Sequence, residues 1–92
     1  MTDNIVVQNE EIISVGELNK SAKYLLENTF NNVSVIGEIS NLSRPSSGHI
    51  YFTLKDEDGA IRCAMFRNQN IKLNFSPENG DQCVLKGQVS IY

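Results

Sequence analysis

The sequence predicts a small, mainly β protein (α+β by strict count) whose strands form a coiled barrel, and three observations support this. Residues 48–67 alternate as two strands joined by a tight acidic turn. Long alternating segments lie on either side of this hairpin, at 33–41 and 83–91. Each carries a glycine near its middle, Gly37 or Gly87, where a strand can bend sharply. Glycine-bent strands around a hairpin indicate a barrel rather than a flat sheet.

Length and composition exclude several classes of protein. The 92 residues, 40% hydrophobic and 21% charged, make one small globular domain with no room for a separate catalytic domain. No apolar run has membrane-spanning length, and the first residues lack the basic stretch of a signal peptide. We therefore expect a cytoplasmic protein that does not contact a membrane.

The cysteines do not indicate a cofactor. Cys63 and Cys83, together with the single histidine, His49, match no zinc-binding spacing. Both cysteines lie in strand patterns, so we expect buried free thiols, with a disulfide as the alternative. No metal site and no cofactor is expected.

Charge is unevenly distributed along the chain. The net charge is −3, which argues against a strongly basic nucleic-acid binder. Residues 1–31 hold two lysines against five acidic residues, whereas residues 32–92 hold six basic and six acidic residues. Any nucleic-acid site must therefore be a local cationic strip, and we expect weak binding.

The first elements are an arm and a helix. Residues 1–12 are mostly polar, and we expect a mobile arm before a domain that covers 13–92. Ser14 and Glu17 have the spacing of a capping box, and Ile13 with Leu18 that of a hydrophobic staple. Apolar residues then recur on one face as far as the asparagine-rich segment 28–32, which predicts a helix that packs into the core. The residues of this face are Val15, Leu18, Ala22, Leu25 and Leu26.

The strands complete most of a known barrel. Val33, Val35 and Ile39 would face inward in the first strand, and residues 68–75 form a connector that can hold a helical turn. Helix, three strands, connector and strand is the order of the five-stranded Greek-key barrel called the OB-fold, without its fifth strand. We expect a piece of a longer protein that ends before that strand. Unpaired edges would favour a homodimer by strand pairing, or addition of residues 5–7 as a surrogate strand.

The hairpin has a defined register. If Asp56–Gly59 form the loop, every apolar pair falls on one face, and a slip of one residue would invert every side chain. The pairs expected on the core face are Leu54/Ile61, Phe52/Cys63 and Ile50/Met65. The pairs expected on the open face are Lys55/Ala60, Thr53/Arg62, Tyr51/Ala64 and His49/Phe66.

The open face carries aromatic and cationic side chains, the chemistry that holds single-stranded nucleic acid. We expect Tyr51 and Phe66 to stack on bases, and His49 to stack or donate to a phosphate. Residues 46–48 form a small loop whose backbone N–H groups can approach a phosphate. Phe66 packed under the connector, and Lys55 balancing the acidic turn, are the alternatives. The full candidate set is Arg44, Ser47, His49, Tyr51, Thr53, Lys55, Arg62 and Phe66.

These motifs resemble one family. The strings Gly37–Asn41, Ser47–His49, Tyr51–Asp56 and Ile61–Arg67, with Arg44 between the first two, resemble the large subunit of exodeoxyribonuclease VII. The resemblance runs from about residue 14 to the last residue, 92. One departure is residue 36, an isoleucine where a polar or acidic side chain is expected.

The resemblance implies a role in DNA degradation. In that family an OB-fold binds single-stranded DNA, and a nuclease domain follows that cuts it to oligonucleotides without added divalent metal. Copies of a small subunit assemble on a long helical region. All catalytic residues would lie outside this chain, which alone is expected to be non-catalytic.

Two other classes remain open. The RNA-binding OB-folds of class II aminoacyl-tRNA synthetases share a Val-x-Gly-x-Ile strand, but the Ser47–His49 and Arg62–Arg67 strings fit them poorly. A protein-interaction domain would use Tyr51, Phe66 and Ile36 to dock another subunit, and the acidic balance favours it. Stand-alone catalysis has the least support, because no nucleophile–base pair is visible.

Overall fold

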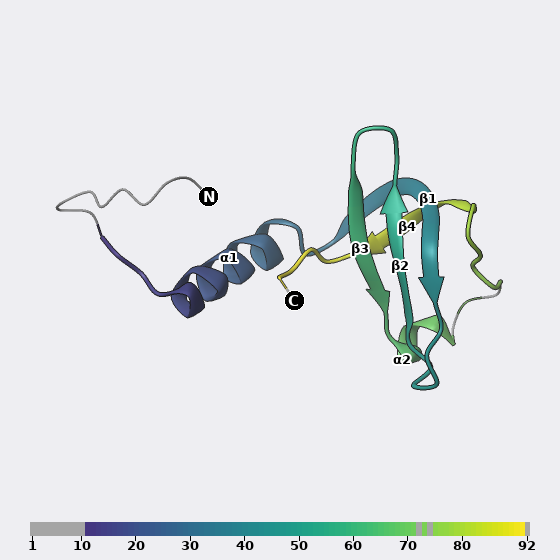
Figure 1. The fold of residues 1–92 in the computed structure, drawn as a ribbon, viewed down its shortest axis with the longest axis horizontal. Coiled ribbons are helices and arrows are strands. Elements are labelled where there is room, and N and C mark those ends of the chain that lie inside the picture. The colour runs from purple at the N-terminus through teal and green to yellow at the C-terminus, as the bar shows by residue number, and fades with distance from the viewer. Residues whose placement is uncertain (1–10, 72, 74, 92) are drawn as a thin grey trace. The chain divides into compact units, whose positions relative to one another are not determined.

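A computed structural model describes residues 11–71, 73 and 75–91 of the chain. Of the predicted arm, residues 1–10, including the 5–7 segment, lie outside the described residues, and residues 11 and 12 have no regular secondary structure. The chain divides into two units, one of residues 1–31 with 88–92 and one of residues 32–87. The elements are coloured along the chain in Figure 1.

The first unit contains helix α1, Val15–Thr29. The Ser14 half of the predicted capping box is confirmed at its start, where the Ser14 Oγ accepts a hydrogen bond from the Glu17 N–H at 3.0 Å. None of the helix residues is buried within its own unit, and the packing of its apolar face into a core stays a prediction. The segment after the sheet contacts this helix: the Val89 N–H donates to the Phe30 carbonyl, and the Ser90 hydroxyl donates to Glu27.

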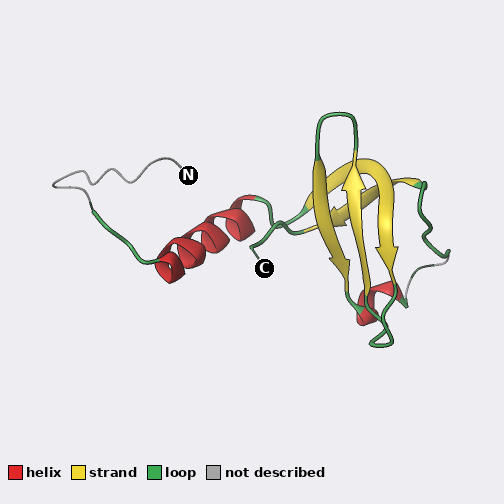
Figure 2. Ribbon diagram, in the orientation of Figure 1, coloured by secondary structure: helices red, strands yellow, loops and turns green. Residues whose placement is uncertain are grey.

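The second unit is one antiparallel sheet, and the predicted OB-type architecture is confirmed. Its strands are β1 (Val33–Ser43), β2 (Ile50–Lys55), β3 (Ala60–Met65) and β4 (Gln82–Gly87), in the order β3-β2-β1-β4. Figure 2 shows that they curl rather than lie flat. The short helix α2 (Arg67–Asn70) supplies the predicted helical turn, at the end of the hairpin opposite its loop.

The hairpin register predicted from the sequence is confirmed at six of its seven pairs, from Ile50↔Met65 to Lys55↔Ala60, and His49/Phe66 lies just beyond the paired stretch. The inner face of β2 forms the core, with Ile50, Phe52 and Leu54 buried against Ile39 of β1. Phe52 is the most enclosed side chain of the four, with 1% of its surface exposed. Alternation in the sequence therefore located the core correctly on this strand.

β1 joins the two halves of the sheet. Its first half pairs with β4, from Val33↔Gly87 to Glu38↔Gln82, and its second half pairs with β2. Gly37 lies between the halves, and a Cβ there would lie 2.8 Å from Leu54 Cγ and 2.9 Å from the Lys55 carbonyl oxygen. Glycine at this position thus has a steric reason: the neighbouring strand passes too close for a side chain.

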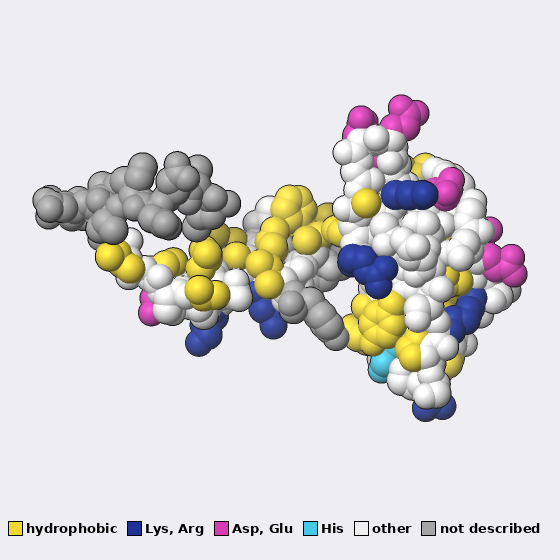
Figure 3. Space-filling model, in the orientation of Figure 1, with side chains coloured by type: hydrophobic (Ala, Val, Ile, Leu, Met, Phe, Trp, Pro, Cys, Tyr) yellow, Lys and Arg dark blue, Asp and Glu magenta, His cyan; other side chains and the backbone are white. Residues whose placement is uncertain are grey.

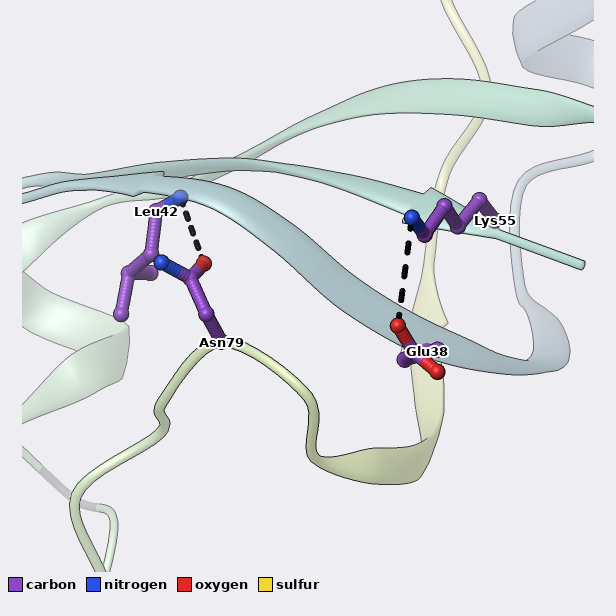
Figure 4. Close-up of polar contacts among 4 residues, drawn as sticks. All are labelled: Glu38, Leu42, Lys55 and Asn79. Atoms are coloured by element: carbon purple, nitrogen blue, oxygen red, sulfur yellow. Dashed lines mark hydrogen bonds and ion pairs between the residues drawn. The ribbon is translucent and has the colours of Figure 1, made fainter.

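A β-bulge in β1 was missed by the sequence analysis. The pairing with β2 passes from Ser40↔Thr53 to Ser43↔Tyr51, which leaves one extra residue on β1. Asn41 takes up this irregularity with φ of 53°, in the left-handed region that asparagine tolerates. The Leu42 N–H beside it donates to Asn79 Oδ1 at 2.9 Å, as Figure 4 shows, so this backbone donor does not remain unpaired.

Three expectations about the strands are corrected. The last strand ends at Gly87, not at residue 91, because Gly87 pairs with Val33 and β1 has no earlier residue to pair with. Val35 and Ile61, expected to face a core, are 41% and 45% exposed. Ile61 lies on β3, which has no strand on its outer side among the described residues, so its side chain is covered from one direction only.

The cysteines are free, as expected, but only half-buried. Both pack against the core from the edge strands, Cys63 on β3 and Cys83 on β4. Burial disfavours the thiolate and raises the pKa of each thiol.

Candidate nucleic-acid interface

The open face of the hairpin brings together most of the predicted site residues. Tyr51, Thr53 and Lys55 alternate with the core residues of β2 and therefore point to the opposite side. Arg62 lies directly opposite Thr53 on β3, and its Nη1 donates to the Thr53 hydroxyl at 3.0 Å. This bond holds the guanidinium along the sheet surface, where its planar group can lie against a base.

An aromatic corner, defined here as His49, Tyr51 and Phe66, lies where β3 ends and β2 begins. The His49 ring is edge-on to both neighbours, with centroids 6.3 Å from Tyr51 and 5.4 Å from Phe66. The predicted neighbourhood of His49 and Phe66 is thus present, although the regular pairing of β2 with β3 ends at Ile50↔Met65. Phe66 is 42% exposed, so much of its ring surface is open to a ligand.

Helix α2 holds the aromatic corner from one side. The Arg67 backbone N–H donates to His49 Nδ1 at 2.9 Å. The Asn70 side chain donates to the Gly48 carbonyl, which ties α2 to the loop before β2. Ser47 Oγ accepts a longer contact from the His49 N–H, at 3.4 Å. The corner is therefore a built arrangement of loop, strand end and helix.

The positive charge of Lys55, at the end of the face next to the acidic turn, is partly neutralised. Lys55 Nζ lies 3.9 Å from Glu38 Oε2 of β1, and both side chains are about half exposed (Figure 4). An exposed pair at this distance contributes little to stability, so Lys55 remains available to another anion. Its partner is Glu38, rather than the acidic turn considered from the sequence.

The acidic turn has a structural role. Asp56 Oδ1 accepts hydrogen bonds from the backbone N–H groups of Asp58 and Gly59, at 2.8 and 2.9 Å. Its carboxylate therefore closes the turn, as aspartate commonly does. Figure 3 shows acidic side chains at this tip, while Lys/Arg patches, the histidine and apolar groups lie further along the hairpin.

Arg44 is the one candidate that the structure uses elsewhere. Its Nη2 donates to Ser76 Oγ at 3.0 Å and to the Pro77 carbonyl, which fixes the loop before β4. Within the part of the chain that the structure describes, no hydrogen bond or ion pair joins this guanidinium to the hairpin face. Conversely, the sequence analysis left out Arg67 and Asn70, although the position of Arg67 directly after Phe66 was a usable signal.

Other kinds of site are not found in the described part of the chain. Among residues 11–71, 73 and 75–91, no three His, Cys, Asp or Glu side chains come together as metal ligands would. Neither described helix has the length and apolar character needed to cross a membrane.

Comparison with known proteins agrees with the fold. The model of the family described as OB-fold nucleic acid binding domain matches residues 13–92, so the chain belongs to that family. Its relatives include proteins named Exodeoxyribonuclease 7 large subunit. That of Haemophilus influenzae (strain 86-028NP) is 46% identical over 84 residues, which are 91% of this chain and 19% of the relative. That of Pasteurella multocida (strain Pm70) is 48% identical over 84 residues, with the same coverage.

The resemblance expected from the motifs is thereby confirmed at the level of these relatives. The chain spans about a fifth of their length, 19% for the two named above. What these relatives do as whole proteins is therefore assigned to this chain only as a proposal.

Proposed function

We propose that this domain binds single-stranded DNA through the open face of the β2–β3 hairpin. The observation that carries the proposal is the aromatic corner, which lies on the same face as Arg62. Aromatic rings stack on any base, and cations contact phosphates, so such a face binds without reading sequence. The proposed site comprises Arg44, Ser47, His49, Tyr51, Thr53, Lys55, Arg62 and Phe66.

We further propose that the domain, residues 13–92, is the DNA-binding part of a larger exodeoxyribonuclease. It would hold single-stranded DNA while a nuclease domain outside this chain cuts it to oligonucleotides. The names of the relatives support this, and so does the shared motif set from Gly37 to Arg67. The partner small subunit would bind outside this chain, and the assembly would work in the cytoplasm, where its DNA substrate is.

Fluorescence anisotropy with a labelled oligothymidine tests the binding proposal. We expect weak binding whose affinity falls as salt rises, because a few phosphate contacts release counterions. Duplex DNA of the same length is the control. Equal or tighter binding to the duplex would contradict a single-strand site, and a strong preference for oligouridine would favour the RNA-binding class.

We also propose that the isolated chain self-associates through strand edges. In the described sheet, β3 and β4 each have a neighbouring strand on one side only. Such edges carry backbone donors and acceptors that a second copy can pair with. Size-exclusion chromatography with light scattering should show a dimer at high concentration, and a clean monomer there would refute the proposal.

A further inference from the structure

Arg67 is a cation beside the aromatic corner that the site described above does not include. It begins α2 directly after Phe66, and its backbone N–H is bonded to His49. Its side chain is exposed, and no carboxylate among the described residues lies within ion-pair distance of it. Its charge is therefore available to a ligand.

The aliphatic part of Arg67 lies against the loop at Gly48. A Cβ built on Gly48 would be 2.9 Å from Arg67 Cδ and 3.1 Å from Arg67 Cγ. Gly48 also has φ of +89°, a conformation that other residues rarely adopt. Because Gly48 has no side chain, the aliphatic part of Arg67 can lie against its backbone, next to His49. The hydrogen bond from Asn70 to the Gly48 carbonyl keeps the loop and the helix together.

The same contacts fix the tautomer of His49. Because Nδ1 accepts the Arg67 N–H, it carries no proton in the neutral ring, and the proton is on Nε2. Nε2–H then has no acceptor among the described residues, where the ring makes a single hydrogen bond, through Nδ1. A neutral donor on His49 and a guanidinium on Arg67, the residue whose backbone is bonded to Nδ1, thus belong to the same corner, and N–H groups of both kinds bind phosphate oxygens.

We propose that Arg67 and the Nε2–H of His49 form a phosphate subsite for the DNA backbone, next to bases stacked on Tyr51 and Phe66. Gly48 and Asn70 are positioning residues of this subsite. The inference rests on the proposed single-strand binding and adds to it the place where the strand is anchored. Arg67 contributes charge there, while His49 contributes a directed hydrogen bond.

The salt dependence of binding tests the charge. Each phosphate contact on single-stranded DNA contributes about 0.7 to the slope of log affinity against log salt. Arg67→Gln should weaken oligothymidine binding roughly three- to tenfold and lower the slope by about 0.7. Arg67→Lys should keep the slope. Lys86→Gln, which removes one exposed cation from β4, is the matched control and should leave both values unchanged.

The positioning role has its own test. Gly48→Ala should displace Arg67 and reproduce the loss seen in Arg67→Gln while the Arg67 charge is still present. Because this variant introduces strain, its fold is checked by circular dichroism. If it unfolds, Asn70→Ala, which removes only the tie to Gly48, tests the same role and should weaken binding in the same direction, with Lys86→Gln again as the unchanged control.

Nitrogen NMR of the imidazole tests the tautomer without any DNA. In the free protein we expect His49 Nδ1 unprotonated and Nε2 protonated, and the Nε2–H signal should shift when oligothymidine is added. A proton on Nδ1 in the neutral ring would overturn the subsite. So would an unchanged salt slope in Arg67→Gln while the wild-type chain binds. If the wild-type chain binds no DNA, the proposed function fails instead.

Discussion

The two faces of the β2–β3 hairpin are built from alternate residues of the same strands, yet they differ in almost every property. The inner face of β2 is closed and apolar, with Ile50, Phe52 and Leu54 buried in the core. The outer face carries Tyr51 and Thr53, which are only half-buried. Neighbouring residues of a strand therefore have different roles: those on the inner face stabilise the sheet, and those on the outer face are available to a ligand.

The outer face of the hairpin contributes little to folding. The polar side-chain contacts of Thr53, Lys55 and Arg62 on this face are the Arg62–Thr53 hydrogen bond and the 3.9 Å Lys55–Glu38 ion pair. Exposed contacts of this kind contribute little to the free energy of unfolding. Substitutions on the two faces should accordingly separate stability from binding.

The largest effect is expected on the inner face. Phe52→Ala removes the most enclosed side chain of the core and should lower the free energy of unfolding by about 3–5 kcal/mol. Urea titration followed by circular dichroism measures this change. A loss of less than about 1 kcal/mol would mean that the core does not depend on this ring.

Tyr51→Ala should have the opposite signature. It removes one stacking surface and should weaken oligothymidine binding by about 1–3 kcal/mol, with the melting temperature nearly unchanged. Arg62→Ala is expected to act in the same direction. Anisotropy and thermal melts of the same samples give both values. If Tyr51→Ala unfolds the domain while Phe52→Ala does not, the assignment of the two faces is inverted.

Thr53→Val tests whether a single hydroxyl on the outer face positions Arg62. Valine keeps the shape of threonine but offers no acceptor to Arg62, so the guanidinium loses its fixed direction. We expect a binding loss of about 0.5–1.5 kcal/mol, the value of one hydrogen bond. Thr53→Ser, which keeps the hydroxyl, is the control. Equal losses in both variants would show that the hydroxyl does not position Arg62.

The smallest expected effect belongs to the half-buried cysteines at the edges of the inner face. Burial raises the pKa of Cys63 and Cys83, so the unfolded chain releases these protons at a lower pH than the folded chain. Their contribution to stability is therefore present below the ordinary thiol pKa of about 8.5 and is lost as pH rises through the folded value. Urea titrations of the wild type and of a double cysteine-to-alanine variant, at about pH 7 and pH 9.5, should show a larger alkaline loss in the wild type.

Local patterns were enough to predict the hairpin. Alternation on both strands, together with Asp56–Gly59 as the loop, fixed all six pairs, because each choice agreed with every other. The capping box at Ser14 was predictable for the same reason: both partners lie within one turn. The open face and most of its candidate residues followed directly from this register.

Features that depend on distant segments were not predictable from local pattern. The bulge at Asn41 is accompanied by a bond from Leu42 to Asn79, far along the chain. The end of β4 is set by where β1 begins, and the bonds of Arg44 depend on a loop some thirty residues later. The aromatic corner was partly predictable. Its three residues were identified from the sequence, but the hydrogen bond from Arg67 that holds His49 was not.

The division of β1 between two partners has a consequence for the order of folding. The β2–β3 hairpin closes a loop of four residues, and β1 reaches β2 across a short connection. β4 pairs with the start of β1 only after the whole intervening chain is in place, which is a larger entropic cost of loop closure. We therefore expect β4 to dock after the transition state, so that conservative substitutions such as Leu85→Ala mainly speed unfolding, whereas those in the hairpin slow folding.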